Sequence, residues 1–131
     1  MSDEANLDAY LKRINYAGSI APTLETLEMV HRLHVATIPF ENLNPLMELP
    51  VRLQLSDLEQ KLLIERRGGY CLEHNLLFRA ELEAMDFKVT PLAAGVLWGH
   101  DDIGLCEIEF HHRLFDAHLL QVLGGFGDHR R

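Results

Sequence analysis

The sequence contains no long hydrophobic run, and this absence excludes the class of membrane-spanning proteins. Its apolar stretches are only a few residues long, whereas a spanning helix needs about 20 consecutive apolar residues. Residues 1–4 are Met-Ser-Asp-Glu, which is acidic and lacks the basic and apolar regions of a secretory signal. We therefore expect a cytoplasmic protein with no membrane partner.

Basic residues are scarce as well: 12 Lys and Arg stand against 20 Asp and Glu, and the formal net charge is −8. Proteins that bind nucleic acid usually carry a basic stripe, because the release of phosphate counterions drives their affinity. Here the basic clusters are short, as at Arg66-Arg67 and Arg130-Arg131, and no aromatic residues alternate with them. The sequence thus indicates no nucleic-acid partner.

Cysteine is nearly absent too, since the chain has only Cys71 and Cys106. Two cysteines do not make a disulfide framework, and a disulfide is not expected in a cytosolic chain. Each cysteine is either a small buried residue or a reactive thiol, and its sequence context has to decide between the two.

What is present is the composition of a globular domain: 131 residues, 47% hydrophobic and 24% charged. Apolar residues recur with helical spacing in four segments, residues 7–14, 23–38, 56–67 and 71–85. The proline-rich stretch 39–50 should be a loop or a pair of extended pieces, and residues 89–98 alternate as in a strand. We predict an α+β fold, with a helical bundle in residues 1–86 and the beginning of a β-barrel or sheet in 87–131.

Particular residues mark the expected helix ends. Thr23 should cap the second helix, and Ser56 opens the third helix with a capping-box pattern. Glycines are the expected stops, Gly18 after the first helix and Gly68-Gly69 after the third. The fourth helix then begins at about Cys71.

The segment RRGGYCLEHN, residues 66–75, contains the candidate nucleophile Cys71. Gly68 and Gly69 should let the backbone turn sharply and leave room for a substrate carbonyl to approach the sulfur of Cys71. A cysteine at a helix start lies near unpaired N–H groups and the positive end of the helix dipole. These groups and the two arginines are expected to lower the thiol pKa and favour the nucleophilic thiolate. The alternative interpretation is a glycine stop followed by a core cysteine.

A cysteine nucleophile also needs a base. The sequence permits a Cys-His pair with a downstream histidine, and the candidates are His111, His112 and His118. Of the upstream histidines on predicted helices, His31 and His34 are expected to be surface or satisfied core residues, and His74 is expected to have a structural role.

A zinc site is a different interpretation of the downstream residues Cys106, His111, His112 and His118, whose types suit that metal. Their spacing follows no compact zinc pattern, and adjacent histidines on a strand point to opposite faces. We therefore expect no metal cofactor.

The segment around Cys71 resembles the active-site motif of the arylamine N-acetyltransferases, in which an arginine and two glycines precede the catalytic cysteine. A second hallmark of that family, IPFENL, is matched by residues 38–43 upstream of the cysteine, and VLWG at 96–99 resembles one of its strands. The match covers roughly residues 1–99. It favours this family over the cysteine proteases, which also place a cysteine near a helix start but whose signatures are absent here.

The resemblance implies a ping-pong acyltransferase with acetyl-CoA as co-substrate and an arylamine or hydrazine as acceptor. It also implies a Cys-His-Asp triad in a cysteine-protease-like arrangement of helical bundle, β-barrel and α/β lid. Cys71 matches the nucleophile, and Phe40 matches a position that lines the acceptor pocket. The positions that support the surroundings of the nucleophile are matched by Arg67, Gly68, Gly69, Glu73 and Asn75.

Beyond residue 99 the chain follows the family less closely. His118, in the segment AHLLQV, matches the strand context of the catalytic histidine, whereas His112 and His111 lie at a more typical separation from Cys71. The Gly-Phe-Gly turn at 125–127 resembles a family turn, but no residue matches the aspartate of the triad.

Members of the family are longer than this chain. The chain is therefore interpreted as a fragment, a natural truncation or the product of a disrupted reading frame. The alternative function is a truncated, catalytically impaired homologue. Such a protein would act as an interaction or oligomerising module, through apolar surface that the absent domains would otherwise cover.

Overall fold

The computed structural model describes residues 4–90, and every regular element in that part of the chain is a helix. The elements are α1 (Leu7–Arg13), α2 (Leu24–Thr37), α3 (Leu43–Leu46), α4 (Leu55–Glu59), the π-helical turn η1 (Gln60–Ile64) and α5 (Cys71–Ala84). The predicted helical bundle is confirmed for these residues. The predicted β region falls outside them, except for residues 87–90, which are not part of a strand.

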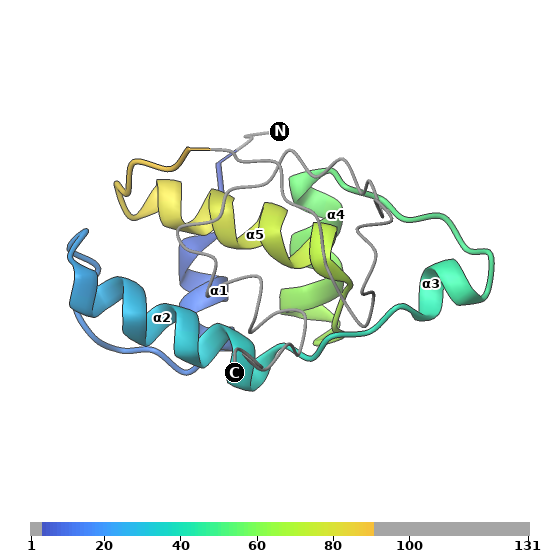
Figure 1. Ribbon diagram of the computed structural model, residues 1–131, viewed down its shortest axis with the longest axis horizontal. Helices are drawn as coiled ribbons and strands as arrows, with labels where there is room; N and C mark the ends of the chain where they lie inside the picture. The colour runs from blue at the N-terminus through green and yellow to red at the C-terminus, as the bar shows by residue number, and fades with distance from the viewer. Residues whose placement is uncertain (1–3, 91–131) are drawn as a thin grey trace, which may run out of the picture.

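The helices pack around α5, which crosses the middle of the molecule (Figure 1). α5 contacts α4 and α1, and aromatic rings of α2 lie against it, as where His34 meets Phe78 with ring centroids 5.0 Å apart. The apolar core lies between these helices and includes Tyr10, Ile14, Val30, Leu62, Leu77, Phe78 and Leu82. No helix among residues 4–90 is both long and apolar enough to cross a membrane.

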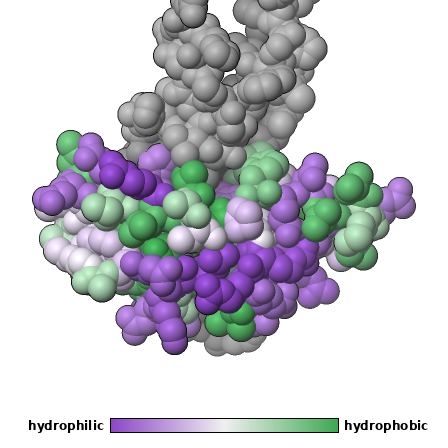
Figure 2. All heavy atoms as spheres, turned by 90° about the horizontal axis from the view of Figure 1, so that it is seen from below, coloured by the Kyte–Doolittle hydropathy of each residue, from purple (hydrophilic) through white to green (hydrophobic). Residues whose placement is uncertain are grey.

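The short helix α3 projects at one end of the molecule, inside the stretch predicted to be loop (Figure 1). Figure 2 shows a hydrophobic cluster at that end and a hydrophilic surface in the middle of the same face. The exposed apolar side chains of this segment are Leu43, Leu46, Met47 and Leu49. Exposed apolar surface of this kind is what an interaction module requires.

Arg13, the last residue of α1, is buried and joins three helical segments. Its Nε donates to the Leu62 carbonyl at 2.9 Å, Nη1 to Thr37 at 3.0 Å and Nη2 to Arg66 at 3.4 Å. Carbonyls at helix C-termini have no partner within their own helix. Because Arg13 supplies donors to them, it fixes the end of α1 against the ends of α2 and η1.

One helix start agrees with the sequence prediction and another does not. The Thr23 hydroxyl accepts the Thr26 N–H at 3.2 Å and caps α2, as predicted. The capping box at Ser56 is wrong, because α4 begins one residue earlier, at Leu55, and its N-cap Gln54 makes no side-chain hydrogen bond.

The glycine stops are also wrong, because α1 ends at Arg13 and η1 at Ile64, before the glycines are reached. The residues with left-handed backbone that follow the helical segments are Asn15 (φ 58°), Glu48 (φ 56°), Arg66 (φ 58°) and Asp86 (φ 63°). Such a residue lets the next N–H bond back to the last turn, as Tyr16 does to the Leu11 carbonyl at 2.9 Å. These bonds end the helices without glycine.

Glu81 lies in the core, fully buried, and neither carboxyl oxygen has a hydrogen-bond partner among residues 4–90. Burial raises the pKa of Glu81 to about 8, and the nearby charge of Glu59 acts in the same direction. The carboxyl is therefore protonated in the folded protein at neutral pH. In the unfolded chain it ionises near its ordinary pKa of 4.5.

We expect stability to fall as the pH rises from about 4.5 to about 8, because over this range Glu81 keeps its proton only in the folded state. Glu81→Gln should remove this dependence. At pH 8 it should raise the free energy of unfolding by more than about 1.4 kcal/mol, the equivalent of one pKa unit. Urea unfolding from pH 5 to pH 8.5 measures the effect. The control is Glu28→Gln, at an exposed position on α2, and equal pH slopes for wild type and Glu81→Gln would contradict the prediction.

Candidate active site

The two sequence motifs lie side by side in the structure. Phe40 and Gly69 form a parallel bridge, in which the Glu41 N–H donates to the Gly69 carbonyl at 2.9 Å and the Gly69 N–H to the Pro39 carbonyl at 3.3 Å. This pairing joins the segment after α2 to the segment that leads into α5. The structure therefore brings Phe40 next to the residues that precede Cys71.

Gly68 and Gly69 are needed for close approach of the backbone. A Cβ on Gly68 would lie 2.0 Å from the Pro39 carbonyl oxygen, and one on Gly69 would lie 2.8 Å from the Cβ of Glu73. The sharp turn predicted at these glycines occurs instead at Arg66, whose φ is 58°. The space beside the glycines is filled by the chain itself.

Cys71 is the first residue of α5, as predicted, and is half-buried. Burial raises the pKa of its thiol, while the backbone N–H groups of Leu72 and Cys71 act in the opposite direction. The prediction of a lowered pKa is thus wrong for this environment. The guanidinium of Arg67 points elsewhere, since its Nη2 bonds to Glu41 Oε1 and to Asn44 Oδ1, both at 2.7 Å.

Glu73 supports the start of α5 from within the fold. Its side chain is only 2% exposed. One carboxylate oxygen accepts the Tyr70 N–H at 3.2 Å, and the other accepts from Lys61 Nζ at 2.7 Å. The first bond satisfies a backbone donor at the helix N-terminus. The second pairs the buried charge, which would otherwise be costly to desolvate.

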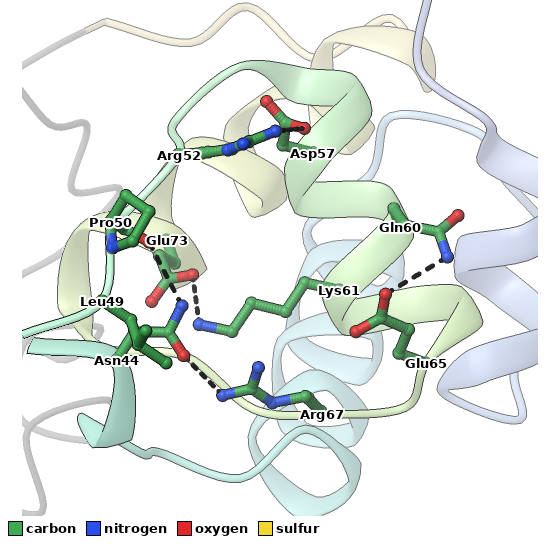
Figure 3. A pocket seen from close by; sticks show the side chains of 10 residues that line it. All are labelled: Asn44, Leu49, Pro50, Arg52, Asp57, Gln60, Lys61, Glu65, Arg67 and Glu73. Carbon is green, nitrogen blue, oxygen red and sulfur yellow. Dashed lines mark hydrogen bonds and ion pairs between the residues drawn. The ribbon is translucent and has the colours of Figure 1, made fainter. Parts of the chain in front are cut away.

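These charged side chains line a pocket of about 390 Å³ on the side of the motif pair that faces α3 and α4 (Figure 3). In this pocket Lys61 reaches toward Glu73, while Arg67 extends to Asn44. Arg52 pairs with Asp57 at 3.9 Å at the rim. The cations and carboxylates around the pocket pair with each other. These pairs hold the segments that surround the start of α5 in place.

Two further predicted site residues, Phe40 and Asn75, lie within the described part of the chain. Phe40 is 55% exposed beside the bridge, and its ring stacks on His74 with an interplanar angle of 5°. Asn75 is buried one turn after Cys71, and its Oδ1 has no hydrogen-bond partner in the part of the chain that the structure describes. A surface phenyl ring and a buried amide therefore both lie near the nucleophile's end of α5.

The three downstream histidines proposed as base, His118, His112 and His111, lie outside the described residues, as does the set proposed for zinc. Of the upstream histidines, His34 and His74 are buried and hydrogen-bonded to each other at 2.9 Å. This agrees with a structural role for both.

Sequence reasoning missed Lys61, Glu41 and Tyr10. Glu41 belongs to the IPFENL motif, and the other motif contains arginines. An acidic residue in one motif and basic residues in the other were a signal that the two could pair. Lys61 and Tyr10 had no local signal, because each contacts residues distant in the sequence, Glu73 and His34 respectively.

Comparison with known proteins identifies one family. A family model described as N-acetyltransferase matches residues 23–117. The arylamine N-acetyltransferase of Mycobacterium tuberculosis is 47% identical over 94 residues, which are 71% of this chain and 33% of that protein. A solved structure of the M. tuberculosis arylamine N-acetyltransferase gives a TM-score of 0.72 at 45% identity, over 76% of this chain and 38% of the other. That of Mycobacterium marinum, in complex with CoA, gives 0.68 at 46% identity, over 71% and 34%.

The helical fold and the paired motifs thus define the class as an N-acetyltransferase. More specifically, this chain belongs to the arylamine N-acetyltransferase family. It spans about a third of the length of the curated relatives it matches.

We expect Gly68→Ala to separate the two motifs, because the new Cβ would overlap the Pro39 carbonyl oxygen. That oxygen belongs to the backbone, so moving it away costs more free energy than rotating a side chain. The free energy of unfolding should fall by more than about 2 kcal/mol, as at other strained or overpacked positions. Chemical denaturation measures it. Gly18→Ala is the control, because its Cβ would meet only the phenol end of Tyr16, which can rotate away. Equal stability of the two variants would contradict the tight contact.

Proposed function

We propose that this chain performs arylamine N-acetyltransfer through an acetyl-Cys71 intermediate, with acetyl-CoA as donor and an arylamine or hydrazine as acceptor. The observation that carries the proposal is the position of Cys71. It is the first residue of a helix whose leading segment is paired with the motif that contains Phe40. Membership of the family and the CoA complex of the M. marinum relative support the choice of donor.

The first half-reaction forms the acyl-enzyme. A base takes the proton of the Cys71 thiol, and the thiolate attacks the thioester carbonyl of acetyl-CoA. The bond from that carbonyl carbon to the CoA sulfur breaks, and the CoA thiolate leaves and takes up a proton. Because burial raises the pKa of the Cys71 thiol, the base is needed at neutral pH.

The second half-reaction restores the enzyme. The acceptor nitrogen attacks the acetyl-Cys71 carbonyl, the bond to the cysteine sulfur breaks, and the nitrogen loses a proton to the base. The start of α5 contributes the backbone N–H groups of Cys71 and Leu72, which favour negative charge on the sulfur. Phe40 offers an exposed aromatic face to a planar acceptor.

His118 is the base in this proposal, and His112 and His111 are its alternatives. Arg67, Glu73 and Asn75 hold the surroundings of Cys71, and the contacts of the first two with Glu41 and Lys61 support that role.

Incubating the full chain with acetyl-CoA should add one acetyl group to Cys71, detected by intact mass and peptide mapping. Aniline should then discharge the acetyl group as acetanilide. Cys71→Ala should show no acetylation, whereas Cys106→Ala should behave as the wild type. Folded protein that shows no Cys71-dependent acetylation would overturn the enzymatic proposal. It would favour a non-catalytic interaction module, and the oligomeric state measured by light scattering would then test that alternative.

The identity of the base predicts the pH dependence of alkylation by iodoacetamide in a Cys106→Ala background. With His118 as base, Cys71 should react readily at pH 6. In His118→Asn the reaction should be at least about tenfold slower at that pH and should rise only towards the ordinary thiol pKa of about 8.5 or above. His112→Asn is the matched control. If instead the slow profile belongs to His112→Asn, the base is His112.

A further inference from the structure

A line of hydrogen bonds between buried side chains crosses the bundle and ends beside Phe40. Tyr10 Oη lies 2.8 Å from His34 Nδ1, His34 Nε2 lies 2.9 Å from His74 Nδ1, and His74 Nε2 lies 3.0 Å from the Pro39 carbonyl oxygen. The three side chains come from α1, α2 and α5, and each is at most 1% exposed. Residues far apart in the sequence therefore meet in one continuous line.

The acceptor at the end of this line fixes the direction of every bond. The Pro39 carbonyl can only accept, so His74 carries its proton on Nε2. A neutral His74 then accepts at Nδ1, which requires His34 to donate from Nε2 and to accept at Nδ1 from the Tyr10 hydroxyl. Burial lowers the pKa of both imidazoles and raises that of the Tyr10 phenol. The neutral forms that this direction needs are the favoured ones.

His74 holds the Phe40 segment in two ways. Its Nε2 bonds to the carbonyl of the preceding residue, Pro39, which also accepts the Gly69 N–H. Its ring lies parallel to the Phe40 ring, with centroids 6.5 Å apart. Phe40 is mostly exposed, and this stack is a contact that restricts its rotation.

The same residue belongs to the helix that carries the nucleophile. His74 lies three positions after Cys71 on α5, so the helix fixes the relation between them. We propose that His74 is a positioning residue for the acceptor site: oriented by Tyr10 through His34, it sets the place of Phe40 relative to Cys71. This proposal rests on the proposed function, because Phe40 matters only if it lines the acceptor site.

If His74 positions Phe40, its loss should affect the two half-reactions differently. His74 makes no hydrogen bond to the Cys71 thiol among residues 4–90, so loss of its orientation should leave acetyl loading of Cys71 nearly unchanged. The acceptor step depends on the placement of Phe40 and should suffer. A residue that served stability alone would affect both steps together.

The sharpest variant is Tyr10→Phe, because it removes one hydroxyl at the far end of the line and keeps the packing of the ring. It leaves His34 Nδ1 without a donor, so the proton pattern of both histidines is no longer fixed. The matched control is Tyr16→Phe, which removes a hydroxyl that donates to the surface carbonyl of Ser19. His74→Phe keeps a ring against Phe40 but loses both hydrogen bonds, and His74→Gln keeps polar groups without the ring.

Imidazole ¹H–¹⁵N spectra of the full chain test the line itself. We expect His34 and His74 to be neutral with the proton on Nε2, and this pattern to be lost in Tyr10→Phe but kept in Tyr16→Phe. The Phe40 ring signals in ¹³C-Phe-labelled protein, assigned with Phe40→Leu, should shift in Tyr10→Phe and in both His74 variants. Unchanged Phe40 signals in these variants would overturn the proposal, and so would a proton on Nδ1 of His74.

Kinetics with aniline as acceptor test the functional consequence. Tyr10→Phe should raise the KM for aniline about tenfold, as expected for one lost oriented hydrogen bond, and His74→Phe, which loses two, should raise it at least as much. Acetyl loading should change less than about twofold in both variants. Equal losses in both steps would show a purely structural role and overturn the proposal. If the wild type does not load acetyl at all, the proposed function fails, and the Phe40 and imidazole signals still decide whether His74 positions Phe40.

Discussion

The carbonyl oxygen of Pro39 is the point on which the candidate site depends. It accepts the Gly69 N–H at 3.3 Å and lies 3.0 Å from His74 Nε2. The chain can approach it this closely only because Gly68 has no Cβ. One acceptor thereby joins the end of α2, the segment before the nucleophile and the helix that carries Cys71. Both family motifs meet at this acceptor.

The interior around this point contains several buried polar side chains, and most of them have a defined partner. Arg13 donates to three carbonyls, and Glu73 pairs with Lys61. Buried polar groups are costly unless they are hydrogen-bonded, so these contacts select one arrangement of the helices. Within residues 4–90 the Asn75 amide oxygen and the Glu81 carboxyl are exceptions, and burial keeps Glu81 protonated by raising its pKa. The site is thus held by directional bonds as well as by apolar packing.

Sequence reasoning was right where the signal was local. Thr23 caps α2, and α5 begins at Cys71, because capping and helical periodicity act within a few residues. It was wrong at Ser56, whose expected capping-box partner Glu59 instead accepts the N–H of Asn6, and at the glycine stops. The end of η1 shows the reason: Arg13 binds the carbonyl of Arg66 from a distant helix, and this contact accompanies a left-handed backbone at a residue with no preference for it.

The sequence by itself determined the family, through two motifs in order, and the place of the nucleophile at a helix start. Only the tertiary structure decided how the motifs meet, which charges pair around Glu73, and that burial raises the pKa of the Cys71 thiol. The physical reason is separation along the chain. Contacts such as His34 with His74, 40 positions apart, form only when the whole bundle packs, and no local pattern of residues encodes them.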